Sequence, residues 1–378
     1  MKIFGKKTFL LYIAAFFFLY TSSLANPCPA AASGPPVTAN SAILMDASTG
    51  QVIFEHKGFS SKEPASLTKI MTSIIALEYG HLNEVSTIRK EAANIYIGQQ
   101  INLAGGDHIT LDNLLKAALI YSANDSTVAI AQHVAGTEEK FVELMNAKAL
   151  VLGALNTRFA NTNGYHNPNH YTTAYDLALI TSYALKNKEF SEVVSMPRAT
   201  LHWADGKKER TVENTNGLVR NNSYEGICGV KTGTTIRAGN CLIAAARKND
   251  RLLIAVILHS HDRYRDAIAL LDYGFYKVSA VNLCDKSEHL YSLPVFGGAK
   301  DYVEAASVEK ISVYLSEEDL KKVSRNVIAL PLKAPVKTGQ QVGTAIFTLN
   351  GHELARVSLV AAGRVDTPGI IFKLKELF

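Results

Sequence analysis

The chain has 378 residues, of which 47% are hydrophobic and 19% are charged. This is the composition of a globular protein long enough for two domains with separate cores, so a disordered or fibrous protein is excluded. The formal net charge of +5 falls to about +2 without the three lysines near the N-terminus, which leaves no broad basic surface for a nucleic acid partner.

Residues 1–25 have the pattern of a secretory signal peptide. Three lysines precede an apolar run at 9–20, and the small residues Ser23 and Ala25 suit a signal peptidase. A retained transmembrane anchor is the alternative, but this run is shorter than the roughly 20 residues that a helix needs to cross a bilayer. We therefore expect cleavage and export to the periplasm or the cell-wall space.

The next segments predict a linker, a strand hairpin and then a helical region. Residues 26–39 are rich in Pro, Ala, Ser and Gly, a composition that cannot bury a core and is typical of a linker. Apolar stretches at 41–46 and 51–55 flank a short turn, which indicates a hairpin. Apolar residues then recur at helical spacing over 66–79, 111–134 and 138–152.

The remaining elements suggest an α/β domain followed by a small β-rich one. A second hairpin is predicted over 239–247 and 251–258, with a helix over 263–276. Strands at both ends around inserted helices indicate one α/β domain, an antiparallel sheet flanked by helices, over 40–281. From 282 to 368 the chain consists of short alternating segments broken by Pro and Gly, which predicts a separate β-rich domain.

The last ten residues, 369–378, place their apolar side chains on one helical face and their charged ones mostly off it. This pattern suits a helix that lies in the membrane interface and gives the protein a peripheral membrane contact. Ten residues are marginal for an isolated helix, so a segment packed on the β-rich domain is the alternative.

The cysteines and histidines indicate no metal or cofactor. Four cysteines (Cys28, Cys228, Cys241 and Cys284) show neither the density of a disulfide scaffold nor the paired spacing of a metal site, and we expect mostly buried free thiols. The eleven histidines include no H-E-x-x-H, and His166 and His170 share a loop without an acidic or cysteine cluster.

Three short motifs occur in the order S-x-x-K, S-x-N and K-T-G, which is the set of the penicillin-recognising serine enzymes. In this first motif set Ser66 and Lys69 form the S-x-x-K, Ser122 and Asn124 form the S-x-N, and Lys231, Thr232 and Gly233 form the K-T-G. A chain of this length contains on the order of one S-x-x-K and one S-x-N by chance. The motifs alone therefore prove little.

A second motif set lies within residues 307–339 and repeats all three patterns. Geometry distinguishes the two sets, because residues three apart lie on one face of a helix but on opposite faces of a strand. Ser66 opens a helical pattern that brings Lys69 beside it, whereas Ser307 leads into an alternating strand pattern. The numbers of residues between the motifs differ as well. The first set leaves enough residues between its motifs for a helical lobe that forms the far wall of a cleft, whereas the second set leaves too few.

The residues around the first motif set carry a family resemblance. Five segments resemble low-molecular-mass penicillin-binding proteins of the serine-type D-alanyl-D-alanine carboxypeptidase family; they are residues 64–72, 122–125, 170–178, 229–233 and 271–275. The resemblance covers about 41–276 and continues more loosely into the C-terminal part. It implies a β-lactamase/transpeptidase-like domain with a helical lobe, followed by the family's β-rich domain.

The resemblance and the needs of acyl transfer assign a role to each residue. Ser66 is expected to attack the carbonyl of the penultimate D-alanine, and Lys69 to take its proton if burial and nearby Lys231 lower its pKa. Asn124 would orient Lys69 and the substrate amide, while Ser122 would pass a proton toward the leaving D-alanine.

The K-T-G strand is expected to bind the end of the substrate. Lys231, with Thr232, Gly233 and Thr234, would hold the terminal carboxylate through charge-assisted contacts. By resemblance, the backbone amides of Ser66 and Thr234 form the oxyanion hole. The loop at 234–237 varies in the family and can tune the choice of substrate.

The partners implied are peptidoglycan stem peptides that end in D-Ala-D-Ala, with β-lactam antibiotics as covalent inhibitors. A class A β-lactamase is one alternative, but it needs a loop glutamate, and residues 158–176 contain none. A wall-binding scaffold with a catalytically weak site is another. Structurally, Ser122 and Asn124 could cap a helix, and Lys231 could be a solvated strand residue.

Overall fold

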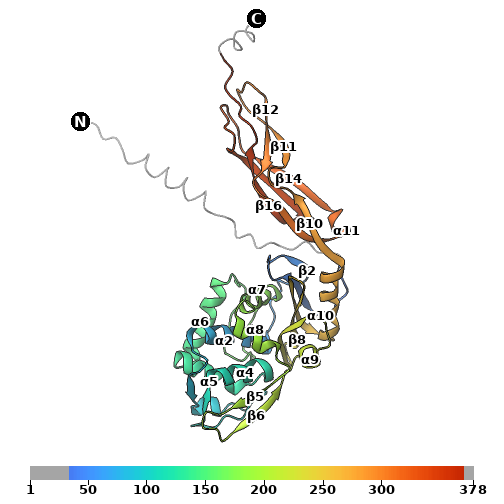
Figure 1. The fold of residues 1–378 in the computed structure, drawn as a ribbon. Helices are drawn as coiled ribbons and strands as arrows, with labels where there is room; N and C mark the ends of the chain where they lie inside the picture. Colours follow the sequence, from blue (N-terminus) through green and yellow to red (C-terminus); the bar gives the residue numbers. More distant parts are fainter. Residues whose placement is uncertain (1–33, 370–378) are drawn as a thin grey trace, which may run out of the picture. The chain divides into compact units, whose positions relative to one another are not determined.

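The computed structural model describes residues 34–369 (Figure 1). The predicted signal peptide, most of the predicted linker and all but the first residue of the tail predicted at 369–378 lie outside the described residues. The described chain forms two compact units, one of residues 34–286 with 310–323 and the other of 287–309 with 324–369. The larger unit thus includes a segment, 310–323, that follows the predicted boundary at 281.

The larger unit is built on an antiparallel sheet in the order β2-β1-β9-β8-β7. Both predicted hairpins are confirmed, although the sheet joins them in an order that departs from the chain order. Ala42 pairs with Ile257, so the first strand lies beside the last one. The strands are β1 (Ser41–Asp46), β2 (Val52–His56), β7 (Ile227–Thr235), β8 (Gly239–Lys248) and β9 (Arg251–Ser260).

Both faces of this sheet are buried. Along β1, Ile43 and Met45 belong to one apolar core, and Ala42 and Leu44 belong to another, as the alternation of a strand requires. Helices α2 (Lys69–Tyr79) and α7 (Ala174–Ala184) cover the first face, and α10 (Arg263–Asp272) covers the second (Figure 1). The predicted helix at 263–276 is thus present but ends in a π turn, η3 (Tyr273–Lys277).

The helical lobe between β2 and β7 contains most of the remaining helices. They are η1 (Ala65–Thr68), α3 (Lys90–Ala93), α4 (Leu111–Lys116), η2 (Ala117–Tyr121), α5 (Asn124–Ala135), α6 (Glu138–Val151), α8 (Lys188–Ser195) and α9 (Gly217–Arg220). Two small hairpins complete the lobe: β3 (Val85–Thr87) with β4 (His108–Thr110), and β5 (Arg198–His202) with β6 (Glu209–Glu213).

The single helix predicted over 111–134 is wrong, because the chain breaks it at Ser122. Helix α4 passes into one π turn, η2, and Ser122 then adopts a left-handed conformation with φ of 72°. A left-handed residue cannot continue a right-handed helix, so α5 begins again at Asn124. The break places the whole S-x-N motif at a helix junction.

A further strand pair follows α10. Strand β10 (Val278–Cys284) pairs with β13 (Ile311–Ser316), which leads into α11 (Glu317–Leu320). The side chain of Gln51 binds both backbone groups of Tyr314, at 2.7 Å each, and Arg251 stacks on the Tyr314 ring at 3.8 Å. These contacts explain why 310–323 belongs to the larger unit.

The smaller unit is one five-stranded sheet in the order β11-β12-β16-β15-β14. Its core comes from alternating residues such as Ala345, Phe347 and Leu349 of β15. The strands are β11 (His289–Pro294), β12 (Tyr302–Ser307), β14 (Val323–Ala329), β15 (Gln341–Leu349) and β16 (His352–Ala361). An antiparallel sheet with helices followed by a β-rich unit confirms the predicted fold class.

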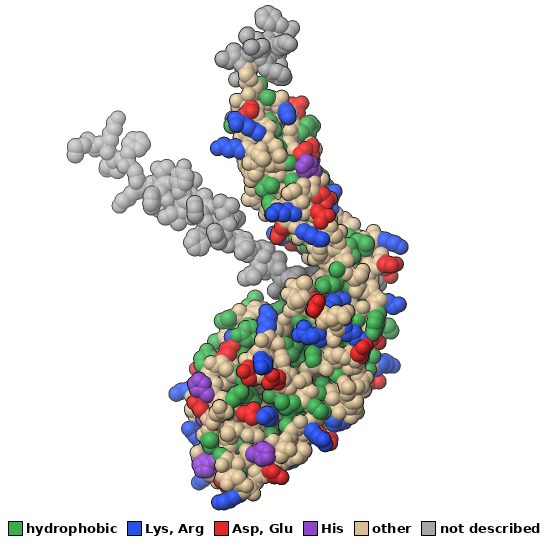
Figure 2. Space-filling view, in the orientation of Figure 1, with side chains coloured by type: hydrophobic (Ala, Val, Ile, Leu, Met, Phe, Trp, Pro, Cys, Tyr) green, Lys and Arg blue, Asp and Glu red, His purple; other side chains and the backbone are tan. Residues whose placement is uncertain are grey.

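Within residues 34–369 no helix has the length and apolar character needed to cross a membrane. Cys241 is a buried free thiol and Cys228 a partly exposed one, Cys284 is buried, and Cys28 lies outside the described residues. On the face drawn in Figure 2, acidic and basic side chains are interspersed over both units.

Candidate active site

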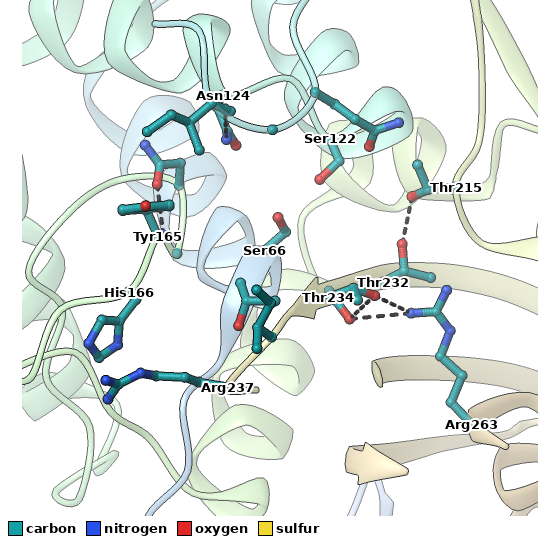
Figure 3. A pocket seen from close by; sticks show the side chains of 18 residues that line it. Ser66, Ser122, Asn124, Tyr165, His166, Thr215, Thr232, Thr234, Arg237 and Arg263 are labelled. Carbon is teal, nitrogen blue, oxygen red and sulfur yellow. Dashed lines mark hydrogen bonds between the residues drawn. The ribbon is translucent and has the colours of Figure 1, made fainter. Parts of the chain in front are cut away.

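The first motif set surrounds a cavity of about 690 Å³ between the helical lobe and β7, the edge strand of the sheet. Six predicted residues line it (Figure 3): Ser66, Ser122, Asn124, Thr232, Gly233 and Thr234. Lys69 and Lys231 lie fully buried beside it. The structure therefore brings together all eight residues that the motifs indicated.

Ser66 and Lys69 meet because the chain is helical here, as predicted. Ser66 lies in η1 and Lys69 begins α2, one turn later. Lys69 Nζ lies 3.0 Å from Ser66 Oγ, 2.7 Å from Asn124 Oδ1 and 2.9 Å from the carbonyl oxygen of Asn163. The last two oxygens can only accept hydrogen bonds. A neutral amine would use its two hydrogens there and keep its lone pair for the hydroxyl of Ser66.

The electrostatic surroundings favour this neutral amine. Burial, and after it the charge of Lys231, holds the pKa of Lys69 well below its ordinary value, while Asp125 acts in the opposite direction. The Lys69 residue is fully buried, with 0% of its surface exposed to solvent. Lys69 is therefore suited to accept a proton at neutral pH.

Lys231 acts from behind the cavity wall. Its ammonium donates to the carbonyl oxygen of Thr232 at 3.1 Å, and it is absent from the lining of the cavity. Burial, and after it the charge of Arg263, lowers the pKa of Lys231 to about 7. Its full burial rules out the alternative of a solvated strand residue.

Arg263 provides a cation at the cavity surface that the motifs did not predict. Its Nη1 lies 3.0 Å from Thr234 Oγ1, 3.2 Å from the carbonyl oxygen of Gly233 and 3.2 Å from that of Cys241. Thr232 Oγ1 donates to Thr215 Oγ1 at 2.7 Å on the same side of the cavity (Figure 3). Hydroxyls and a guanidinium thus converge beside β7.

Ser122 and Asn124 face the cavity from the broken helix. The N-cap residue of α5 is Ala123 and has no side-chain cap, so neither motif residue caps the helix. Asn124 binds Lys69 through Oδ1 and donates from Nδ2 to the carbonyl oxygen of Ile97 at 2.7 Å. Figure 3 shows the Ser122 hydroxyl directed toward Ser66.

The turn that carries Ser66 is fixed by neighbouring backbone and a buried histidine. Thr68 Oγ1 donates to the carbonyl oxygen of Ala65 at 2.8 Å and lies 2.9 Å from His170 Nε2. The amide of Ala160 donates to His170 Nδ1 at 3.3 Å, so the ring proton is on Nε2 and points to Thr68. His170 therefore supports the turn that carries Ser66 in its neutral form.

Two glycines allow this close packing. A Cβ on Gly164, whose φ is +87°, would lie 1.8 Å from the carbonyl oxygen of Ala65, and a Cβ on Gly233 would lie 3.0 Å from the amide nitrogen of Ser66.

The two acids near the motifs have structural contacts. Asp125 accepts hydrogen bonds from the backbone amides of Ile101 and Leu103. Asp176, on the first turn of α7, accepts from the chain at 156–157.

The second motif set forms no comparable site. Ser307 ends β12 and is buried, while the Lys310 side chain is 58% exposed and lies 3.9 Å from Asp285. Within the described part of the chain, no group of three or more metal-binding side chains occurs.

A sequence model of the D-alanyl-D-alanine carboxypeptidases (peptidase S11) matches residues 29–262, and one of the C-terminal domain of penicillin-binding protein 5 matches residues 279–367. The chain belongs to the D-alanyl-D-alanine carboxypeptidase family. This confirms the resemblance that the motifs indicated.

Several members of this family cover nearly the whole chain. D-alanyl-D-alanine carboxypeptidase DacF of Bacillus subtilis is 33% identical over 347 residues, which cover 89% of this chain and 88% of the relative. DacC of Escherichia coli is 32% identical and covers 94% of this chain, with 91% of its own length matched. The crystal structure of DacD from Francisella tularensis has a TM-score of 0.74 at 26% identity and covers 89% of this chain and 95% of its own.

Proposed function

We propose that the protein is a serine-type D-alanyl-D-alanine carboxypeptidase that removes the C-terminal D-alanine from peptidoglycan stem pentapeptides. The observation that carries this proposal is the buried amine of Lys69, which lies 3.0 Å from Ser66 Oγ while two other oxygens occupy its hydrogens. The family of the chain supports the same substrate class.

The reaction proceeds through an acyl-enzyme on Ser66. Lys69 accepts the hydroxyl proton as Ser66 Oγ attacks the carbonyl carbon of the penultimate D-alanine. The amides of Ser66 and Thr234 stabilise the oxyanion. As the peptide C–N bond breaks, Ser122 gives its proton to the leaving amine of the terminal D-alanine and takes up the proton held by Lys69, which becomes neutral again. Water then attacks the ester carbonyl carbon while Lys69 accepts a proton from it. The ester C–O bond breaks, Lys69 returns this proton to Ser66 Oγ, and the shortened peptide leaves as an acid.

The terminal carboxylate of the substrate binds beside β7. The hydroxyls of Thr232 and Thr234 and the guanidinium of Arg263 are the groups that can contact it directly. Lys231 lies behind them, and an anion in the cavity favours its charged form. A peptide with an amidated C-terminus should therefore be a poor substrate.

Penicillin should acylate Ser66, and the acyl group should then be released slowly. A class A β-lactamase releases the acyl group with a loop glutamate, and no carboxylate side chain lines this cavity within the described residues. The alternative of a catalytically weak wall-binding scaffold is disfavoured by the position of Lys69.

The test is mass spectrometry of the protein after incubation with penicillin and, separately, with a D-Ala-D-Ala peptide. We expect a persistent penicillin adduct and release of one D-alanine from the peptide. Ser66→Ala should abolish both, and Ser307→Ala, in the second motif set, should change neither. Penicillin hydrolysis without a lasting adduct would instead favour a β-lactamase, and an adduct without peptide hydrolysis would favour the scaffold.

The location of the protein is part of the same proposal. An enzyme of the cell wall must be exported, and the pattern of residues 1–25 predicts a signal peptide for this purpose. The amphipathic pattern at 369–378 supports a peripheral contact with the outer face of the cytoplasmic membrane.

A further inference from the structure

The cavity extends beyond the part that a terminal dipeptide needs. On the other side of Ser66 from Arg263, Figure 3 shows His166 and Arg237. Tyr165 and Ile236 also line the cavity and come from the same two segments, the loop that contains Asn163 and the turn that follows β7. The volume of about 690 Å³ suits a ligand of drug size.

The charge of this lining has one sign. Among the described residues that line the cavity, the charged side chains other than histidine are Arg237 and Arg263. Arg263 is already bonded to three oxygens. Arg237, in contrast, is exposed and makes no hydrogen bond or ion pair with the described part of the chain. Its five donors are available to a ligand.

The hydrogen bond to Glu63 fixes the orientation of His166, which lines the same cavity as Arg237. Its Nδ1 lies 3.0 Å from Oε1 of Glu63, and the two side chains are 31% and 26% exposed. Glu63 does not line the cavity, so its carboxylate orients the ring from behind and leaves Nε2 as the nitrogen directed elsewhere. Because the Nδ1 hydrogen is donated to Glu63, Nε2 of the neutral ring carries a lone pair and accepts hydrogen bonds, so the donors for an anion come from Arg237. Among the described residues, no carboxylate side chain lines the cavity.

The position of Arg237 matches the length of an extended peptide. Arg237 is three positions after Thr234, and an extended chain rises about 3.3 Å per residue, so the two lie at most about 10 Å apart along the chain. A substrate that lies antiparallel to β7, with its terminal carboxylate at Thr232 and Thr234, covers a similar distance in three residues. Its third residue from the C-terminus then lies near Arg237.

We propose that Arg237, in the part of the cavity wall that also contains His166, forms a subsite for a side-chain carboxylate on the residue that precedes the penultimate D-alanine. The inference rests on the function proposed above and names the class of stem peptide. The preferred stem has a diamino dicarboxylic acid with a free carboxylate at this position. A stem with lysine there, or with the carboxylate amidated, binds less well because Arg237 is left without an anion.

The test compares three stem pentapeptides ending in D-Ala-D-Ala, with diaminopimelate, diaminopimelate amide or lysine as the third residue. For the wild type we expect kcat/KM to be about tenfold or more higher for the free acid, as for a charge-assisted contact. Arg237→Gln should lower kcat/KM for the free-acid peptide to the kcat/KM that the wild type has for the amide peptide. The loss should fall mainly on the free-acid peptide, and kcat/KM for the lysine peptide and the rate of penicillin acylation should fall far less. Arg265→Gln, an exposed arginine outside the cavity lining, is the matched control.

The outcomes separate the two proposals. Equal kcat/KM for the three peptides in the wild type, or an equal loss for all three in Arg237→Gln, would overturn the subsite. A similar loss in Arg265→Gln would show a general effect of charge and would also overturn it. If the wild type hydrolysed none of the peptides, the proposed function would fail. Competition of each peptide with penicillin acylation would then still rank their binding, and equal competition would reject the subsite.

Discussion

His170 connects the protonation of a buried side chain to the turn that carries Ser66. It is 2% exposed, and burial lowers its pKa to about 4. Its neutral ring accepts the amide of Ala160 and donates to Thr68, and a second proton on Nδ1 would face the Ala160 N–H. The folded protein therefore resists protonation at a position that the unfolded chain protonates easily.

This arrangement predicts a pH dependence of stability. The ordinary pKa of histidine is about 6.5, so between pH 6.5 and about 4 the unfolded chain binds a proton that the folded chain excludes. The contribution of His170 to the free energy of unfolding is complete above pH 6.5 and decreases as the pH falls, by about 2 kcal/mol between pH 7 and pH 5. His170→Gln should remove this part of the pH dependence of the free energy of unfolding.

The measurement is urea unfolding of the wild type and the variant at both pH values. His261→Gln, at an exposed position, is the control and should keep the slope of the wild type. The same slope in the wild type and in His170→Gln would show that His170 is not the group responsible.

At the scale of elements, the loop at 160–166 supports η1 through Gly164. Gly164→Ala should slow penicillin acylation at least tenfold and lower the Tm, because the added Cβ collides with the backbone of Ala65. Gly153→Ala is a matched control, since Gly153 also has a positive φ, +78°, but open space around it. That variant should cost only the backbone strain of about 1–2 kcal/mol. Equal acylation rates in the two variants would contradict the proposed support.

The elements also show how far the sequence could predict the site. The hairpins and the serine-lysine turn were predictable, because alternation and helical spacing are local properties. The break at Ser122 was not, since apolar residues such as Ile120 and Val128 keep helical spacing on both sides of it. Serine in a left-handed conformation has no signal in the sequence.

Other parts of the site were hidden for a different reason. Arg263, Thr215 and Asn163 belong to none of the three motifs, and only the folded chain brings them to the cavity or to Lys69. The carbonyl oxygen of Asn163 is a backbone group, which any residue could supply. For Arg263, the sequence showed only an arginine at the start of a predicted helix. Such an arginine is common in proteins of every function and does not indicate a binding site.

At the scale of the whole molecule, the larger unit depends on residues far along the chain. Gln51→Ala removes both hydrogen bonds to the backbone of Tyr314 and leaves that strand less well bound. We expect the free energy of unfolding of the larger unit to fall by about 1–3 kcal/mol. Gln341→Ala, at an exposed position of β15, should change stability by less than about 0.5 kcal/mol. Equal effects in urea unfolding would mean that β13 adds little to the larger unit.

The order of strands in the large sheet has a consequence for the time course of synthesis. The hairpin of β1 and β2 is synthesised early. Ala42 of β1 pairs with Ile257, however, so one edge of β1 has no partner strand until most of the larger unit has been synthesised. Pairings between such distant residues form slowly. This strand order postpones closure of the central sheet until the last of its strands has been synthesised. A chain exported as we propose would cross the membrane before folding, and the late closure is compatible with that order of events.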